Sequence, residues 1–333
     1  MKPYPLLFEP IYKEKVWGGR SLEGLGKTLP EGVKIGESWE LADLPVEIEG
    51  GRSVIANGLW HGQTLHDVLR DQHAHILGPQ ATQSQFPLLI KYLDARENLS
   101  VQVHPSPDYA AAHPEVHLKS EAWVILEAEP GAVIYKGIKP GVTPKQFAEH
   151  ISTGKVVDDL VTIPVSVGEC HYLPSGTCHA LGAGIVVAEV QTPSDTTFRV
   201  YDWGRTDREI HVEEALACID FNPVPDEPAD PLPLLEADGL CTRRLVKTDF
   251  FEIDRMEVAA ETEFEVVTGG GAWIWMLQAG EGVLRSGEAG EIRVKKGDTI
   301  LMPAALQDTM AVLAPGSAWL SVSPPSPYRN VIA

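Results

Sequence analysis

The sequence predicts a mainly β protein built from two β-barrels and a few short helices. Most of the chain consists of short alternating or apolar runs bounded by Gly, Pro, Asn and Asp, which is the pattern of all-β sandwiches and barrels. A strand–turn–strand motif at residues 168–179 recurs in altered form at residues 297–308. A Pro-rich stretch lies between the two copies. Together these three observations indicate a duplicated barrel with a linker between the copies.

The length and charge of the chain limit its class and its partners. With 333 residues it is long enough for two domains of ordinary size. The formal net charge of −20 opposes binding to nucleic acid or to an anionic membrane, but an anionic small substrate can bind where Lys and Arg converge. No apolar run approaches the roughly 20 residues that span a bilayer, and residues 1–10 lack the apolar core of a signal peptide. We expect a cytoplasmic protein that is a monomer or a small homo-oligomer.

Three segments have the pattern of short helices. Residues 64–78 begin with a Thr that can cap a helix, carry apolar residues at helical spacing and end with Gly. A second helix is expected from Thr143-Pro144 to Gly154, and a third over residues 212–218. Strands are expected elsewhere, with the clearest patterns at residues 122–126, 132–135, 185–190, 273–277 and 318–322.

The motif at residues 168–179 reads Gly, five residues, Pro, one residue, Gly, two residues, His. This spacing predicts a strand, a tight turn and a second strand that opens with an inward imidazole, His179. In the copy at residues 297–308, Ala305 replaces the second Gly and Asp308 replaces the His. A second repeat aligns residues 121–137 with residues 271–287 and matches Glu121 with Gly271. The N-terminal copy alone is therefore expected to bind a metal.

The Pro-rich stretch at residues 222–233 is expected to pair with no sheet and to act as a stiff linker. It divides the chain into an N-terminal domain at 1–222, which carries the helical insertions, a linker at 223–236 and a C-terminal domain at 237–333. The last of these has the size of one small β-domain.

Four side chains in the N-terminal part can supply a metal site. Strand alternation puts Gln102 and His104 on one face, with Ser100 as a third member. Glu121 opens the next strand, and His179 adds a second imidazole. Two imidazoles, one carboxylate and one amide suit a divalent cation, and we predict one Zn²⁺ ion per chain.

A zinc cluster of Cys170, His171, Cys178 and His179 is the alternative, and we reject it. The spacing lacks the Cys-x-x-Cys pairs of structural zinc sites. In a strand–turn–strand, moreover, these four side chains cannot all face one point. We interpret both cysteines as small buried hydrophobes.

The motif Gly-x5-Pro-x-Gly-x2-His resembles that of the cupin superfamily, whose fold is a jelly-roll β-barrel. The surrounding sequence is similar to type I mannose-6-phosphate isomerases in their short bacterial form. The resemblance extends nearly end to end and is carried by residues 16–19, 36–40, 87–91, 99–105, 119–123, 174–180 and 191–202. The segments Ser-Val-Gln-x-His-Pro and Ser-Asp-Thr-x-x-Arg are the most specific. Departures are mild, with Cys178 and Phe198 where Val and Tyr are more usual.

This resemblance implies two cupin-type barrels, the first catalytic and the second degenerate, without metal ligands. It also implies a zinc-dependent aldose–ketose isomerase that interconverts mannose 6-phosphate and fructose 6-phosphate through an enediol(ate). The family's zinc ligands match Gln102, His104, Glu121 and His179, and its active-site arginine matches Arg199. Asp195 is expected to orient Arg199 or to take part in proton transfer.

Further residues are expected in the same cleft. Lys91 and Lys119 are expected to be catalytic cations, and Ser100 is expected to bind the phosphate group. The cleft lining is expected to include Trp17, Glu37 and Lys136. The residue that moves the proton stays open among a carboxylate, a lysine and a metal-bound water.

Two other functions fit parts of the same pattern. A non-catalytic cupin that binds a sugar phosphate through its metal would use the same four ligands. A cupin dioxygenase would use two His and one carboxylate to hold iron. Gln102 in the ligand set and the segment around Arg199 argue against the dioxygenase.

Overall fold

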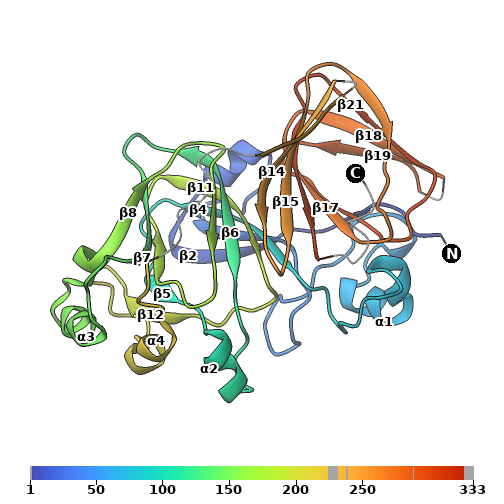
Figure 1. The fold of residues 1–333 in the computed structure, drawn as a ribbon. Coiled ribbons are helices and arrows are strands. Elements are labelled where there is room, and N and C mark those ends of the chain that lie inside the picture. The colour runs from blue at the N-terminus through green and yellow to red at the C-terminus, as the bar shows by residue number, and fades with distance from the viewer. Residues whose placement is uncertain (1, 224–231, 238, 288, 326–333) are drawn as a thin grey trace.

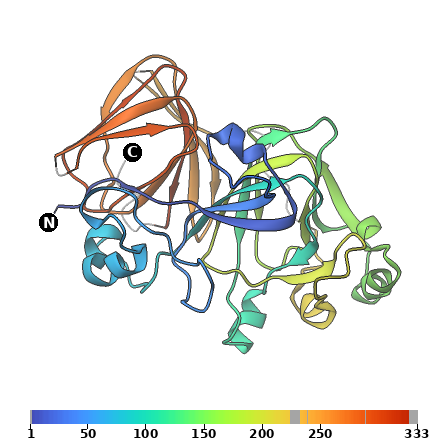
Figure 2. The same ribbon diagram turned by 180° about the vertical axis from the view of Figure 1, so that it is seen from behind.

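The computed structural model describes residues 2–223, 232–237, 239–287 and 289–325. It is mainly β, as predicted, and its named strands pair in antiparallel fashion. Figures 1 and 2 show two β-rich halves side by side. Helix α1 (Leu65–Ile76) lies beneath the C-terminal half in Figure 1, and the other labelled helices lie along the N-terminal half. None of the helices in the described ranges is long and apolar enough to cross a membrane.

Two sheets make up the N-terminal half. The six-stranded sheet has the order β2-β3-β4-β11-β6-β9, and the five-stranded sheet has the order β12-β5-β10-β7-β8. In chain order the strands are β2 (Ile11–Gly19), β3 (Ile35–Leu41), β4 (Leu89–Ala95), β5 (Val101–Val103), β6 (Glu121–Ala128), β7 (Val133–Ile138), β8 (Leu160–Pro164), β9 (Cys170–Leu173), β10 (His179–Leu181), β11 (Ile185–Gln191) and β12 (Phe198–Tyr201).

Two further sheets make up the C-terminal half. The seven-stranded sheet has the order β1-β20-β17-β22-β15-β14-β13, and the four-stranded sheet has the order β16-β21-β18-β19. The strands are β1 (Leu6–Leu7), β13 (Leu232–Ala237), β14 (Leu240–Lys247), β15 (Glu252–Val258), β16 (Thr262–Glu265), β17 (Trp273–Ala279), β18 (Glu281–Ser286), β19 (Gly290–Lys295), β20 (Thr299–Met302), β21 (Thr309–Leu313) and β22 (Ala318–Ser323).

The two halves repeat the same order of neighbours. In the N-terminal half β6 pairs with β9 and β11, and β7 pairs with β10 and β8. In the C-terminal half β17 pairs with β20 and β22, and β18 pairs with β21 and β19. The two sequence repeats occupy corresponding strands, with β9 and β10 matching β20 and β21. The topology therefore agrees with a duplication.

The predicted helices are confirmed, and their caps explain their limits. Thr64 accepts a hydrogen bond from Asp67 N–H at the start of α1. Helix α3 (Pro144–Thr153) begins after Thr143, which accepts from Gln146 N–H, and ends at Gly154 with φ of 72°. Helix α4 (Val212–Cys218) has the predicted bounds. Helix α2 (Pro107–Ala112), with Ser106 as its cap, was not predicted.

The five strand segments predicted most clearly are also confirmed, as β6, β7, β11, β17 and β22. Their buried side chains form separate cores within each half and one core between the halves. The core between the halves joins residues such as Tyr92 and Val190 of the N-terminal half to Phe251 and Met276 of the C-terminal half. The interface is therefore apolar and continuous.

Part of the predicted linker forms a strand. Residues 224–231 lie outside the described residues, but Leu232–Ala237 form β13 and pair with β14. The prediction that the Pro-rich stretch pairs with no sheet is therefore wrong for residues 232 and 233. Pro233 has no backbone N–H to donate. It is tolerated because β13 is the edge strand of its sheet, and one side of an edge strand has no neighbouring strand to bond.

The N-terminus also crosses the predicted division at residue 222. Strand β1 pairs with β20, so Leu6 lies opposite Leu301 and Leu7 opposite Ile300. Helix α1 contacts the same half, because the backbone N–H groups of Ala304 and Ala305 donate to the carbonyls of Ile76 and His75. The C-terminal sheet is therefore completed by residues from the start of the chain.

Candidate metal centre and active-site cleft

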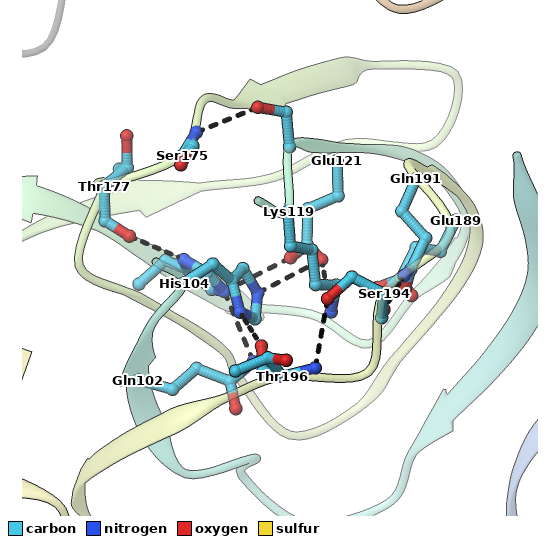
Figure 3. Close-up of polar contacts among 12 residues, drawn as sticks. Gln102, His104, Lys119, Glu121, Ser175, Thr177, Glu189, Gln191, Ser194 and Thr196 are labelled. Atoms are coloured by element: carbon cyan, nitrogen blue, oxygen red, sulfur yellow. Dashed lines mark hydrogen bonds and ion pairs between the residues drawn. The ribbon is translucent and has the colours of Figure 1, made fainter. Parts of the chain in front are cut away.

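Three predicted metal ligands meet between the two N-terminal sheets. Glu121 is the first residue of β6 and His179 the first residue of β10, whereas His104 directly follows β5. His104 Nε2 lies 3.3 Å from Glu121 Oε2, and His179 Nε2 lies 3.2 Å from Glu121 Oε1. The three donor atoms all lie within 4.8 Å of one another. Figure 3 shows His104 and Glu121 pointing toward each other from different strands.

The other ring nitrogen of each histidine is bonded to a backbone carbonyl. His104 Nδ1 lies 3.0 Å from Thr196 O, and His179 Nδ1 lies 2.8 Å from Thr177 O. A carbonyl can only accept, so both Nδ1 atoms carry the proton and both Nε2 atoms present lone pairs to the centre. Backbone partners of this kind fix the ring orientation in metal sites.

Buried atoms without hydrogen bonds point into the same place. His104 Nε2 and both carboxylate oxygens of Glu121 are buried without a hydrogen-bond partner, although Lys119 Nζ forms an ion pair with Glu121 Oε2. Such atoms are costly unless a cation or another partner satisfies them. These atoms and the adjacent His179 Nε2, two imidazole nitrogens and a carboxylate in all, therefore fit a divalent metal ion.

The charge state of the centre also suits a metal. Burial, aided by the nearby Lys119 ammonium, lowers the pKa of His104 to about 3, so its imidazole is neutral at pH 7. Burial alone would raise the pKa of Glu121, but Lys119 and the two histidines hold that pKa well below its usual range. Lys119 Nζ lies 2.8 Å from Glu121 Oε2. Glu121 is thus an anion next to the neutral imidazole of His104.

Gln102 joins this centre to the rest of the sheet. It lies opposite His179 in the β5–β10 pairing and opposite Arg199 in the β5–β12 pairing. Lys136 lies opposite His179 in the β7–β10 pairing. Residues directly opposite in antiparallel strands share a face. Lys136, His179, Gln102 and Arg199 therefore form one row across the five-stranded sheet, which we call the cross-strand row.

Gln102 also contacts the centre directly. Its Nε2 lies 3.3 Å from His179 Nε2, and its Oε1 accepts from Ser100 Oγ at 3.2 Å. Rotation of the amide by half a turn would exchange the two atoms, so either can face the centre. Gln102 therefore lies beside the three-residue group and in contact with His179.

A cleft of about 300 Å³ opens beside this centre. Residues of both N-terminal sheets and of the loops after β12 line it. They are Lys15, Trp17, Glu37, Trp39, Lys91, Leu93, Leu99, Ser100, Gln102, Lys119, Trp123, Glu189, Asp195, Thr197, Arg199, Arg208 and His211. The lining is rich in charged side chains, and most of these are paired.

The floor of the cleft is a buried network of charges. Lys91 Nζ lies 3.1 Å from Glu189 Oε1 and 3.6 Å from Glu37 Oε2. Trp39 Nε1 donates to Glu37, and Trp123 Nε1 donates to Glu189, at 2.6 and 2.9 Å. Burial alone would lower the pKa of Lys91, but Glu189 and Glu37 raise that pKa above its usual range. Lys91 is therefore held in its charged form by these two carboxylates.

Most of the predicted site residues lie in the cleft, namely Trp17, Glu37, Lys91, Ser100, Gln102, Lys119, Asp195 and Arg199. Lys136 is buried next to His179 in the cross-strand row and is not among the described residues that line the cleft. Asp195 is exposed at the rim. Among the described contacts Arg199 Nη1 donates to Glu209 O, and no ion pair joins it to Asp195. The suggestion that Asp195 orients Arg199 therefore has no contact in its support.

The cysteines do not contribute to the centre. Among the described residues none of the four forms a disulfide, and Cys178 is fully buried, where burial raises the pKa of its thiol. Cys178 packs in an apolar cluster with Val103 and Phe198. The interpretation of Cys178 as a buried hydrophobe is confirmed.

Comparison with known proteins identifies the family. The model of the type I phosphomannose isomerase catalytic domain matches residues 6–127, which include three of the four predicted ligands. A mannose-6-phosphate isomerase of Bacillus subtilis is 34% identical over 92% of this chain and 95% of its own length. The chain belongs to the type I mannose-6-phosphate isomerase family. A mannose-6-phosphate isomerase of Streptococcus mutans is also 34% identical, over 91% of this chain and 93% of its own length.

Solved structures of the mannose-6-phosphate isomerase family agree in fold. A crystal structure of a mannose 6-phosphate isomerase from Bacillus subtilis has a TM-score of 0.85 at 30% identity and covers 96% of this chain and 99% of its own. A phosphomannose isomerase variant from Salmonella typhimurium has a TM-score of 0.77 at 17% identity, covering 97% of this chain and all of its own. At that lower identity the likeness concerns the fold alone.

Several residues that line the cleft were missed from the sequence, among them Glu189, Arg208 and His211. Glu189 had a signal, because it is the one charged residue in the apolar strand Ile185–Gln191. Arg208 and His211 had only a weak signal, since they lie in a loop of mixed charge between residues 202 and 212. Arg208 and His211 lie near Arg199 only because the loop folds back, and no periodic pattern in the sequence specifies how a loop folds.

Proposed function

We propose that this protein interconverts mannose 6-phosphate and fructose 6-phosphate through an enediol(ate) intermediate, the activity for which its relatives are named. One observation carries the proposal beyond family membership. The buried His104, Glu121 and His179 group adjoins a cleft that also holds Arg199, Lys91 and Lys119. This combination supplies the electrostatic stabilisation that an enediolate and a phosphate ester require.

We further propose that each half of the chain is a cupin-type jelly-roll barrel. The repeated order of neighbouring strands in the two halves supports this division. In the C-terminal half, Gly271 precedes β17 and Asp308 precedes β21, at the positions that match Glu121 and His179. Asp308 is exposed and pairs with Lys2. Apolar side chains such as Trp275 and Trp319 fill that half, which supports a structural role for it.

The residues proposed to hold the metal are His104, Glu121, His179 and Gln102, and zinc is the proposed ion. Nitrogen and oxygen donors in these numbers suit zinc. When bound, the ion would supply Lewis-acid stabilisation to the oxygens of the reacting sugar carbons. Lys119, at 2.8 Å from Glu121, would keep that carboxylate ionised.

The remaining cleft residues have proposed roles that follow from their charge. Lys91 is held as a cation by Glu37 and Glu189, so we propose that it orients and stabilises sugar oxygens and transfers no proton. Arg199 would contribute a fixed positive charge because a guanidinium stays protonated. Ser100 and Trp17 would contact the substrate. The proton-transferring group is proposed to be among the carboxylates and Lys119 at the cleft.

A coupled assay tests the proposal. Purified protein should convert mannose 6-phosphate to fructose 6-phosphate, and a strong chelator should abolish turnover until zinc is restored. Folded, zinc-loaded protein that binds mannose 6-phosphate without turnover would instead support the non-catalytic binding protein. Stoichiometric iron with substrate-dependent oxygen consumption would support the dioxygenase.

A further inference from the structure

The five cationic side chains of the cleft differ in how they are neutralised. Lys15 and Lys91 pair with Glu37, and Lys119 pairs with Glu121, at 3.0, 3.6 and 2.8 Å. Arg199 and Arg208 lie at the other end, on and after β12. Among the described residues no ion pair within 4.0 Å neutralises Arg199. The guanidinium of Arg199 is therefore the cleft cation without an ion pair among the described residues, and Arg208 lies in the same lining.

Arg208 is held in place by a buried carboxylate. Its Nε and Nη2 donate to the two oxygens of Asp202 at 2.8 and 2.5 Å. Asp202 also accepts two hydrogen bonds from Arg205, whose Nη1 lies 3.6 Å from Glu97 Oε2 as well. The side chain of Asp202 is 0% exposed. Arg208 thus lines the cleft in a fixed orientation, and it shares the carboxylate of Asp202 with Arg205.

His211 fixes the neighbouring arginine. The backbone N–H of Arg199 donates to His211 Nδ1 at 3.2 Å, and the backbone N–H of His211 donates to Arg199 O at 2.8 Å. Because Nδ1 accepts, the ring proton sits on Nε2, which makes Nε2–H a donor at the cleft. The nearest carboxylate to it, that of Glu209, is 3.9 Å away and 84% exposed.

The guanidinium of Arg199 has spare donors as well. Its Nη1 donates to Glu209 O at 2.8 Å, whereas its Nε is buried and has no hydrogen-bond partner among the described residues. A buried N–H donor without an acceptor costs free energy unless a ligand accepts its hydrogen bond. Two fixed guanidinium groups and one imidazole N–H thus converge on one end of the cleft.

This end is separate from the metal centre. In the cross-strand row Arg199 lies two strands from His179, with Gln102 between them. Neighbouring strands are about 4.8 Å apart, so the two backbones are separated by roughly 10 Å. A ligand that reaches both ends must be extended, with its anionic group remote from the atoms at the metal centre.

We propose that Arg208 and His211, together with Arg199, bind the phosphate group of the substrate, and that Asp202 positions Arg208 for this contact. This inference rests on the proposed function, because it assigns the part of the substrate that this end of the cleft receives. Planar guanidinium groups with fixed donors suit a tetrahedral dianion. Of the two arginines bound to Asp202, only Arg208 lines the cleft, so the pair provides a matched comparison.

Binding of inorganic phosphate, measured by calorimetry on the zinc-loaded full chain, tests the subsite without reference to turnover. Arg208→Gln should weaken phosphate binding about 10-fold or more, because charge-assisted hydrogen bonds are lost. His211→Asn should weaken phosphate binding by a smaller factor. Arg205→Gln should leave the affinity within about twofold, because Arg205 donates to the same carboxylate outside the cleft. Glu209→Gln should strengthen phosphate binding, since it removes the nearby negative charge.

Steady-state kinetics of the same variants should show whether a substitution changes KM or kcat. Arg208→Gln should raise the KM for mannose 6-phosphate and change kcat much less, and Arg208→Lys should recover only part of the loss. Asp202→Asn should also raise KM, as expected of a positioning residue. Metal content and thermal unfolding, measured on each variant, identify any variant that has lost its fold.

Two results would overturn the inference. Equal phosphate affinity in folded Arg208→Gln and in the unaltered protein would remove Arg208 from the subsite. Equal losses in Arg205→Gln and Arg208→Gln would mean that the loop as a whole, and not Arg208, determines binding. If phosphate binding depends on Arg208 and no isomerisation occurs, the subsite stands and the proposed isomerase function fails.

Discussion

Lys91 and Glu189 lie directly opposite each other in the pairing of β4 with β11, and their Nζ and Oε1 atoms are 3.1 Å apart. Trp39 lies opposite Lys91 on one side, and Trp123 lies opposite Glu189 on the other. A buried ion pair is thus flanked by two indole rings whose N–H groups donate to the carboxylates of Glu37 and Glu189. The arrangement fixes both the charge and the direction of the Lys91 ammonium.

Replacement of Lys91 should therefore affect both activity and stability. Lys91→Met leaves the buried carboxylate of Glu189 without its cation and leaves Glu37 with Lys15 alone, which should lower the free energy of unfolding by about 3–5 kcal/mol. Isomerase activity should fall about 100-fold or more, while the metal content stays unchanged. Denaturant unfolding and the coupled assay measure the two effects. Lys145→Met on the exposed face of α3 is the control, and a Lys91→Met variant as active as that control would contradict the assignment.

The stability of the fold should depend on pH through Glu37. Burial alone would raise the pKa of Glu37, but Lys91, Lys15 and the Trp39 N–H lower it from 4.5 to about 2. The ionised form is thus favoured in the folded state, so the stabilisation is complete above about pH 4.5 and is lost as the pH falls toward 2. Its size is at most about 3 kcal/mol.

Glu37→Gln checks this dependence. The variant should be less stable at pH 7, and its free energy of unfolding should fall less steeply than that of the unaltered protein between pH 4.5 and 2. Denaturant unfolding at several pH values gives both curves. Parallel curves would show that Glu37 titrates alike in the folded and unfolded chain.

Removal of a metal ligand should abolish metal binding together with activity. His179→Ala deletes one of the three donors that lie within 4.8 Å of one another, and elemental analysis should find well under one metal ion per chain, against about one in the unaltered protein. His150→Ala is the matched control because His150 pairs with Asp159 at 2.8 Å outside the cleft. Full metal occupancy in His179→Ala would exclude His179 as a ligand.

Removal of Arg199 should separate metal binding from catalysis. Arg199→Ala leaves the three-residue metal group intact and should keep full metal content, whereas kcat/KM should fall about 100-fold or more. The coupled assay and elemental analysis on one preparation measure both quantities. Retained activity in this variant would remove Arg199 from the mechanism.

The metal group could be predicted from the sequence because each member occupies the first position of a strand or a position fixed by strand alternation. Glu121 and His179 open β6 and β10, as expected, and Gln102 lies in β5. Helices α1 and α3 were found where a capping Thr marked the start, but α2 was missed although Ser106-Pro107 offered the same kind of signal.

Other parts of the site depend on which strands become neighbours. Strand alternation places Lys136 on the inner face of its sheet. There it lies beside His179 and is not among the described residues that line the cleft. Glu189 contributes to the cleft because β11 lies between β4 and β6, and Arg208 does so because its loop folds onto Asp202. Sheet order and loop folding are set by long-range packing, so one sequence without relatives does not specify them.

Strand β1 has a consequence for how the protein is made. Leu6 and Leu7 are synthesised long before their partners, Leu301 and Ile300. The C-terminal sheet therefore cannot be completed during translation until β20 has left the ribosome. Until then β1 lacks its partner strand, and an unpaired strand invites pairing between molecules. An amino-terminal tag or deletion near residue 6 would act on the assembly of the opposite half.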